Sequence, residues 1–239
     1  MLGKVRYLTL LPVYIFVLAV VLLAAFTTNR AITTITEETP VKNRMCVVID
    51  PGHGGIDGGA VSCTGFYESH INLEISMRLD DLLHLLGIHT LMTRKSDISI
   101  HTAGESIAAK KVSDLKQRVN IVNTTQNAML ISIHQNYFSD SRYAGAQVFY
   151  AGTQHSEKLA KQMQTSLKSV LNPTSKRLAK KADGIYLLQN INCPGILVEC
   201  GFLSNPVEEA KLRDKTYQNK ICCVIASTVS QYLNSSIIA

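Results

Sequence analysis

Three acid–base side chains lie near the ends of three short apolar runs. His53 follows the first run after an Asp-Pro-Gly turn, His134 ends the second, and Glu199 lies near the end of the third. Runs of this length and composition predict buried strands. They span residues 47–49, 128–134 and 196–201. Open α/β sheets bind ligands at the carboxyl ends of their strands, so we expect the three side chains to converge there.

Two histidines and one carboxylate can hold a zinc ion and leave a fourth position to water, which is the ligand set of hydrolytic zinc sites. A further carboxylate then serves as general base. Glu68, in the first turn of the next helical stretch, can supply the ligand carboxylate, with Glu74, Asp50 and Asp57 as alternatives. Asp50 is better placed to orient a ligand histidine from outside the metal shell. Glu199 fits the base, although residue types alone also allow it as a ligand.

Four motifs carry a resemblance to a known family. They are residues 50–55 (Asp-Pro-Gly-His-Gly-Gly), Glu68, residues 132–136 (Ser-Ile-His-Gln-Asn) and residues 198–205 (Val-Glu-Cys-Gly-Phe-Leu-Ser-Asn). In content and order they resemble those of the zinc-dependent N-acetylmuramoyl-L-alanine amidases (amidase type 3), and the resemblance runs from about Arg44 to the C-terminus. The short form, with one domain and an N-terminal apolar segment, is most similar to the germination-specific spore-cortex amidases.

The resemblance implies a role for each of these side chains. His53, Glu68 and His134 hold one Zn²⁺, and Glu199 is catalytic, taking a proton from the attacking water and passing it to the departing amine. Asn136 either hydrogen-bonds substrate or caps its loop. The bond implied is the amide between N-acetylmuramic acid and the L-alanine of the peptidoglycan stem peptide. In spore-cortex members this cut prepares muramic acid for conversion to its lactam by a separate deacetylase.

Other residues that match the family are expected to be structural. Residues 93–97 form a Thr-Arg-x-x-Asp tract, and Arg118 and Asn120 lie on a predicted helix, where we expect helix-surface and cap contacts. Cys200 follows the catalytic glutamate, and strand alternation directs it to the opposite face of the sheet, where it packs as a small apolar residue. The six cysteines form no Cys-x-x-Cys pair, which disfavours a cysteine zinc site.

Positive charge gathers between residues 173 and 183, in Lys176, Arg177, Lys180 and Lys181. We expect a solvated loop here, with a rim that attracts anionic substrate as the alternative interpretation. The formal net charge of +6 favours anionic partners such as lipid headgroups, wall polymers or nucleic acid. No zinc-finger or RNA-binding motif accompanies the charge, so a nucleic-acid partner is not expected.

The elements that position these groups alternate between helices and strands. Helices are expected at residues 67–86, 113–126, 155–170, 206–212 and 217–233, and further strands at 88–93, 145–151 and 184–188. Such alternation implies right-handed crossovers and a mostly parallel sheet with helices on both faces. The resemblance implies the same fold, a single α/β domain around a roughly six-stranded sheet, here preceded by an N-terminal apolar helix.

An uncharged apolar run, residues 8–26, follows Lys4 and Arg6. It is roughly as long as a bilayer-spanning helix, and its basic flank predicts an amino terminus in the cytoplasm with the rest of the chain outside. We therefore expect an exported, extracytoplasmic protein, membrane-anchored or secreted. Residues 1–27 form a signal anchor, favoured by the length of the run, or a cleaved signal peptide. Residues 28–43 form a linker and residues 44–239 the zinc amidase domain.

Two other functions would draw on the same sequence. An exported zinc peptidase acting on another substrate would have the same ligands and base. A non-catalytic wall-binding module is disfavoured because every expected metal and base position is filled. The amidase itself either acts alone on peptidoglycan or depends on an accessory protein that helps to hold metal or substrate.

Overall fold

The computed structural model describes residue 18 and residues 45–237 of the 239-residue chain. The predicted N-terminal apolar helix and linker, residues 1–43, lie outside the described residues apart from Leu18. None of the described helices is both long enough and apolar enough to cross a membrane. The fold below is that of the unit Met45–Ala239, to which all the predicted site residues belong.

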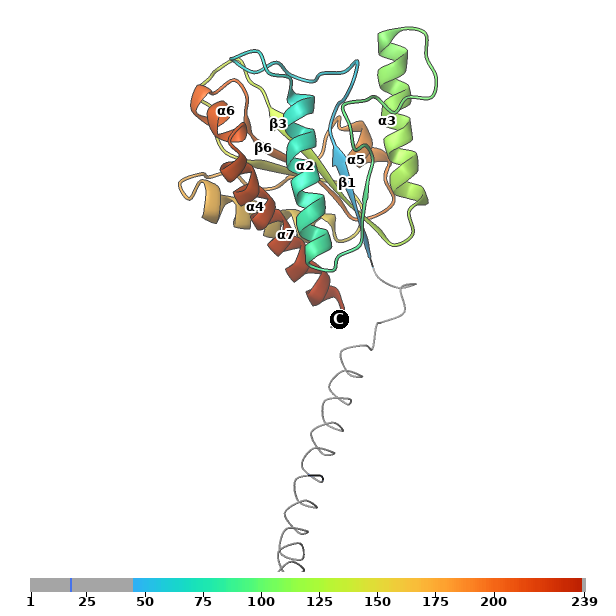
Figure 1. Cartoon of the computed structure of the whole chain (residues 1–239), viewed down its shortest axis with the longest axis vertical. Helices are drawn as coiled ribbons and strands as arrows, with labels where there is room; N and C mark the ends of the chain where they lie inside the picture. Colours follow the sequence, from blue (N-terminus) through green and yellow to red (C-terminus); the bar gives the residue numbers. More distant parts are fainter. Residues whose placement is uncertain (1–17, 19–44, 238–239) are drawn as a thin grey trace, which may run out of the picture. The chain divides into compact units, whose positions relative to one another are not determined.

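Six strands form one sheet at the centre of this unit (Figure 1). In spatial order they are β2 (Thr90–Met92), β1 (Cys46–Pro51), β3 (Ala128–Asn136), β6 (Gly195–Phe202), β4 (Gln147–Tyr150) and β5 (Lys180–Lys181). The first four run parallel, whereas β4 is antiparallel to β6 and β5 is parallel to β4. The predicted α/β domain with a mostly parallel, six-stranded sheet is confirmed.

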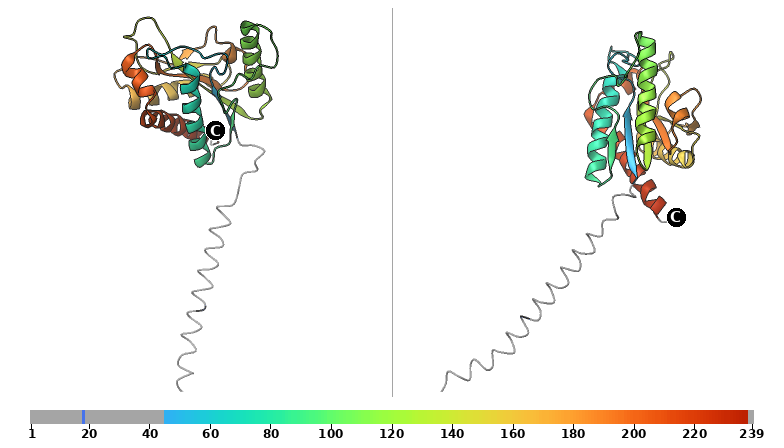
Figure 2. Two further views of the ribbon diagram at one scale, coloured as in Figure 1. Left: turned by 45° about the horizontal axis from the view of Figure 1, so that its top comes forward. Right: turned by 90° about the vertical axis from the view of Figure 1, so that its right-hand side faces the viewer.

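Helices cover both faces of the sheet (Figure 2). They are α2 (Glu68–Leu85), α3 (Ile107–Thr124), α4 (Ser156–Leu171), α5 (Tyr186–Asn190), α6 (Pro206–Leu212) and α7 (Lys215–Ile237). Side chains of α2, α4 and α7 join one apolar core with the sheet, and side chains of α3 and α5 join a second. Strands β1 and β3 contribute to both cores, which is why their sequences are continuous apolar runs.

The two cores decide which way the site residues point. Ile133 on β3, and Val198 and Cys200 on β6, belong to the α2–α4–α7 core. His134 and Glu199 are their sequence neighbours and therefore point to the opposite face of the sheet. Cys200 is 1% exposed, so the expectation that it is a buried residue facing away from Glu199 is confirmed.

The strand predicted at residues 184–188 is wrong, because α5 occupies this place. Gly184 turns the chain with a φ of +74°. The adjacent side chains of Leu187 and Leu188 then both pack into the second core. Successive side chains of a strand face opposite sides, so a strand would separate these two neighbours, whereas the helical turn of α5 brings both to one core. The start of α3 also differs, since this helix begins before the predicted residue 113.

Candidate metal centre and active site

The loop after β1 carries His53 to the carboxyl edge of the sheet. His53 has a left-handed backbone conformation with φ of +60°, which is uncommon for a non-glycine residue. Gly52 is required by close packing, because a Cβ atom there would overlap the His134 imidazole. At Gly59 a Cβ atom would lie only 2.6 Å from Glu68 Oε2 and 2.8 Å from His53 Cδ2. The two glycines thus allow the histidines and Glu68 to approach one another.

His53, Glu68 and His134 come together at this edge. Each offers one ligand atom, and these atoms all lie within 4.8 Å of one another. His53 Nε2 is 3.3 Å from Glu68 Oε2, and His134 Nδ1 is 3.1 Å from Glu68 Oε1. Two ligand atoms of a tetrahedral zinc ion are about 3.3 Å apart when each bond is about 2.0–2.1 Å long. The three residues therefore form a candidate metal site whose donor types fit zinc and whose two Glu68–histidine distances match that spacing.

The Glu68 carboxylate is held on both oxygens. Oε1 accepts hydrogen bonds from Asn72 Nδ2 and from the backbone amide of Gln135, each 3.1 Å, and Oε2 accepts one from the Ala60 amide, 3.0 Å. Burial alone would raise the pKa of Glu68, but hydrogen bonds and charge from the two histidines lower that pKa far below its ordinary value. Glu68 is therefore ionised and fixed in place, as a metal ligand must be.

Asp57 orients the His53 ring from outside the ligand set. Its Oδ2 atom lies 2.9 Å from His53 Nδ1, and its Oδ1 atom lies 2.8 Å from Lys111 Nζ. This arrangement leaves His53 Nε2 facing Glu68. Burial alone would lower the pKa of His53, but hydrogen bonds to Asp57 and Glu68 raise it to about 9. The sequence-based choice of Asp50 for the orienting role is wrong, because Asp50 pairs with a buried arginine instead.

Glu199 lies beside His134 on the neighbouring strand. The two residues are paired in the register of β3 and β6 and point to the same face. Glu199 Oε2 is buried and accepts no hydrogen bond from any residue that the structure describes. Burial raises the pKa of Glu199 to about 7. A carboxylate with a buried, unpartnered oxygen next to the candidate metal site is able to take up and release a proton there.

The two remaining candidates have different surroundings. Glu74 is exposed on α2 and accepts a hydrogen bond from Gln218 Nε2 on α7, 2.9 Å, so it is not part of the candidate metal site.

Asn136 ends β3, where the register with β6 shifts after His134. Its backbone carbonyl accepts a hydrogen bond from the Leu203 amide, 2.8 Å, which joins the two strand ends. Substrate binding by the Asn136 side chain stays a prediction.

A buried arginine beneath the His53 loop is the main residue that the sequence did not reveal. Arg118 is 2% exposed, so the expectation of a helix-surface contact is wrong. Its guanidinium donates to Asp50 Oδ1 and Asp114 Oδ2, both at 2.6 Å. It also donates to the backbone carbonyls of Pro51 and His53, at 2.8 and 2.7 Å. Arg118 therefore ties the strand end to the backbone of a candidate ligand.

Arg94, in the family-like tract of residues 93–97, supports the same loop. It is 3% exposed and donates to the carbonyls of Pro51, Gly52 and Ser69 at 3.0, 2.9 and 3.0 Å. Together the two guanidiniums donate to the backbone carbonyls of residues 51–53, which helps to satisfy these groups away from water. Asn120, the other residue expected on a helix surface, is exposed.

Replacing Arg118 with leucine is expected to lower the free energy of unfolding by about 3–5 kcal/mol, because the change leaves the Asp50 carboxylate buried without its cationic partner and removes the side-chain donor to the His53 carbonyl. Urea denaturation of the purified protein measures the effect. Lys116→Leu is the matched control, because it also replaces a positive side chain of α3 with leucine, but at an exposed position. It should leave the urea midpoint nearly unchanged. Equal midpoints for the two variants would show that the buried pair contributes nothing.

A known family model matches nearly the whole described domain. The model of the family Amidase_3, N-acetylmuramoyl-L-alanine amidase, matches residues 47–231. The chain belongs to this amidase family. The matched segment contains the three residues of the candidate metal site and also Glu199, the neighbouring carboxylate. The resemblance predicted from the four sequence motifs is confirmed, and with it the enzyme class.

Individual amidases are similar over most of their length. A Bacillus subtilis (strain 168) protein named germination-specific N-acetylmuramoyl-L-alanine amidase is 40% identical over 188 residues, which are 78% of this chain and 78% of the relative. The solved structure of the CwlD amidase from Clostridioides difficile, in complex with the GerS lipoprotein, is 39% identical with a TM-score of 0.77 and covers 80% of this chain and 100% of that one. The N-acetylmuramoyl-L-alanine amidase of Clostridium difficile 630 is 31% identical, with a TM-score of 0.70 over 81% of this chain and 98% of its own.

Proposed function

We propose that this amidase hydrolyses the amide bond between the lactyl group of N-acetylmuramic acid and the L-alanine of the peptidoglycan stem peptide. The observation that carries the proposal is the convergence of His53, Glu68 and His134 within 4.8 Å, beside Glu199, in a chain of the amidase family. The first three residues are the ligands of one Zn²⁺ ion, and Glu199 is the catalytic acid–base group. Asn136, at the end of β3, is a candidate substrate ligand.

The two histidines and Glu68 suit zinc, which supplies a Lewis acid that acidifies water and polarises a carbonyl oxygen. Glu199 accepts a proton from the water that attacks the amide carbonyl carbon. As the carbon–nitrogen bond breaks, Glu199 gives this proton to the departing alanine nitrogen. The second water proton is released when the new lactyl acid ionises, so the products are a lactyl carboxylate and a free amine. The Oε2 atom of Glu199 has no partner among the described residues, and this leaves it available for both transfers.

The setting that we propose is the spore envelope. Similarity to a germination-specific amidase supports a role in spore-cortex maturation, where removal of the stem peptide prepares muramic acid for lactam formation. The CwlD structure with its GerS lipoprotein supports an accessory partner for this chain as well. Residues 1–27, as a signal anchor or signal peptide followed by the linker 28–43, would place the catalytic domain of residues 44–239 outside the cytoplasm.

Mass spectrometry of digested wall fragments identifies the bond that is cut. The zinc-loaded protein is expected to release stem peptides with a free L-alanine amine and to leave glycan strands with free lactyl carboxyl groups. A chelator should stop the reaction, and added zinc should restore it. Cleavage inside the peptide would identify an exported zinc peptidase instead. Intact glycan–peptide linkages, with bound zinc verified, would support a non-catalytic wall-binding module.

A further inference from the structure

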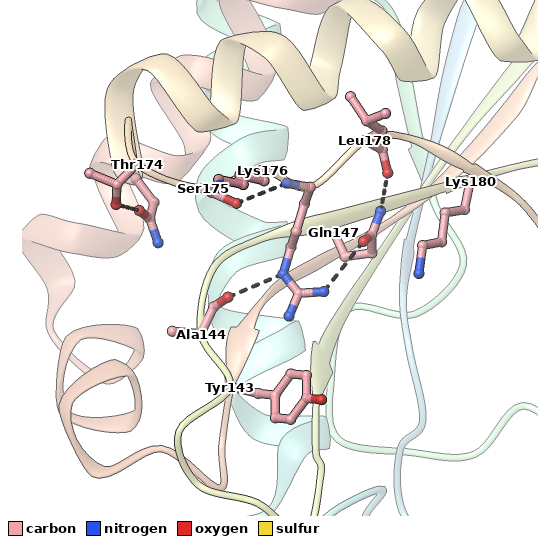
Figure 3. A pocket seen from close by; sticks show the side chains of 10 residues that line it. Tyr143, Ala144, Gln147, Thr174, Ser175, Lys176, Leu178 and Lys180 are labelled. Atoms are coloured by element: carbon pink, nitrogen blue, oxygen red, sulfur yellow. Dashed lines mark hydrogen bonds between the residues drawn. The ribbon is translucent and has the colours of Figure 1, made fainter.

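A pocket of about 570 Å³ lies between the start of β4 and the segment that leads into β5 (Figure 3). Lys176, Arg177 and Lys180 line it together with Tyr143 and Gln147, and its lining contains no acidic side chain. Among the described residues, no ion pair involves Lys176, Arg177 or Lys180. The pocket is therefore a cationic cavity without an internal counterion, in the segment where the sequence already allowed an anion-attracting rim.

Arg177 is held in place rather than loose in solvent. Its Nε atom donates to the Ala144 carbonyl at 3.1 Å, and its Nη1 atom lies 3.4 Å from Gln147 Oε1. Its guanidinium carbon lies 4.9 Å from the centre of the Phe202 ring, a stacking geometry that favours a cation. Gln147 is fixed in turn, since its Nε2 atom donates to the Leu178 carbonyl at 2.7 Å (Figure 3).

The pocket adjoins the candidate active site across one strand. Gln147 is paired with Glu199 in the antiparallel register of β4 and β6, and opposite side chains of such a pair lie on the same face. Phe202, under Arg177, belongs to the same strand as Glu199. Neighbouring strands are about 4.8 Å apart, so the path from β6 across β4 to the segment before β5 is roughly 10 Å. An extended peptide spans this length with about three residues.

We propose that this pocket binds a free carboxylate on the peptide arm of the substrate, about two or three residues from the bond that is cut. The proposal rests on the proposed amidase function and deepens it. A preorganised guanidinium can bind a carboxylate through two parallel hydrogen bonds. Lys176 and Lys180 add positive potential at the mouth of the pocket. The site thereby selects acidic peptide arms over arms whose carboxylate is blocked as an amide.

Two soluble muramyl peptides test the proposal, one with the free carboxylate at the second peptide residue and one with that group amidated. The unaltered enzyme should show a KM about tenfold lower for the free acid, because a hydrogen bond to a charged group contributes about that factor, with similar kcat for both.

Arg177→Gln should raise KM for the free acid by about tenfold and leave kcat for this substrate unchanged. Both kcat and KM for the amidated substrate should also stay unchanged. Arg177→Lys should restore part of the lost affinity. Lys158→Gln, which removes an exposed charge from α4, is the control and should change nothing.

The outcomes separate this inference from the function on which it rests. Cleavage of neither peptide by the unaltered enzyme would contradict the amidase assignment itself. Equal KM values for the two peptides would overturn the carboxylate pocket alone, and that comparison holds even if Arg177→Gln fails to fold. A variant that is impaired only on intact wall, and not on the soluble acid, would assign the pocket to an anionic wall polymer and would also overturn the proposal.

Discussion

Glu199→Gln is expected to lower kcat by roughly 10²–10⁴-fold while the protein still binds one zinc ion. The amide has the shape of the carboxylate but cannot accept a proton from water, so the change removes the chemistry and keeps the packing between β3 and β6. Steady-state cleavage of a soluble muramyl peptide measures kcat, and metal analysis of the same sample measures zinc content. KM should change far less than kcat, because the residue acts on the reacting proton.

The matched control is Glu74→Gln, which makes the same chemical change at an exposed position on α2. This control should retain full activity, since Glu74 contacts Gln218 of α7 rather than the candidate metal site. Loss of zinc in Glu199→Gln would mean that Glu199 is a metal ligand and not the base. Retention of full activity would remove it from the mechanism altogether.

His134→Ala is expected to weaken zinc binding by more than about 100-fold, because loss of a residue that only orients a ligand already costs about 10–100-fold. The change removes the Nδ1 atom that lies 3.1 Å from Glu68 Oε1 and leaves the buried Glu68 carboxylate with fewer partners. Competition against a chelator of known affinity measures the zinc dissociation constant, and peptide cleavage should fall with metal occupancy.

Thermal unfolding gives an independent measure of the same site. Zinc that binds only the folded protein raises the melting temperature, so added zinc should stabilise the unaltered protein and stabilise His134→Ala much less. His89→Ala, which removes an exposed imidazole, should respond as the unaltered protein does. An equal zinc-induced shift in His134→Ala would place the metal elsewhere.

The sequence alone determined the strands that carry the candidate site residues and the end of the sheet at which the chemistry lies. Continuous apolar runs are a local signal of buried strands, and the runs that precede His53 and His134 became β1 and β3. The period-two alternation of a strand then predicted, without any knowledge of the fold, that the side chains of Cys200 and Glu199 face opposite sides of the sheet. Family-like motifs selected Glu68 among several acids, a choice that residue types did not decide.

Only the tertiary structure decided what surrounds those groups. Arg118 and Asp50 are 68 residues apart in the chain, and no local pattern distinguishes a helix arginine that pairs with a buried carboxylate from one in solvent. The partner of His53 was likewise undetermined, because the left-handed backbone at His53 brings Asp57, and not Asp50, to Nδ1. The α5 turn formed where a strand was predicted, because the second core required Leu187 and Leu188 on one side. Contacts of this kind depend on packing between segments that are distant in the sequence. The periodicity of apolar residues indicates only which residues of one segment are buried.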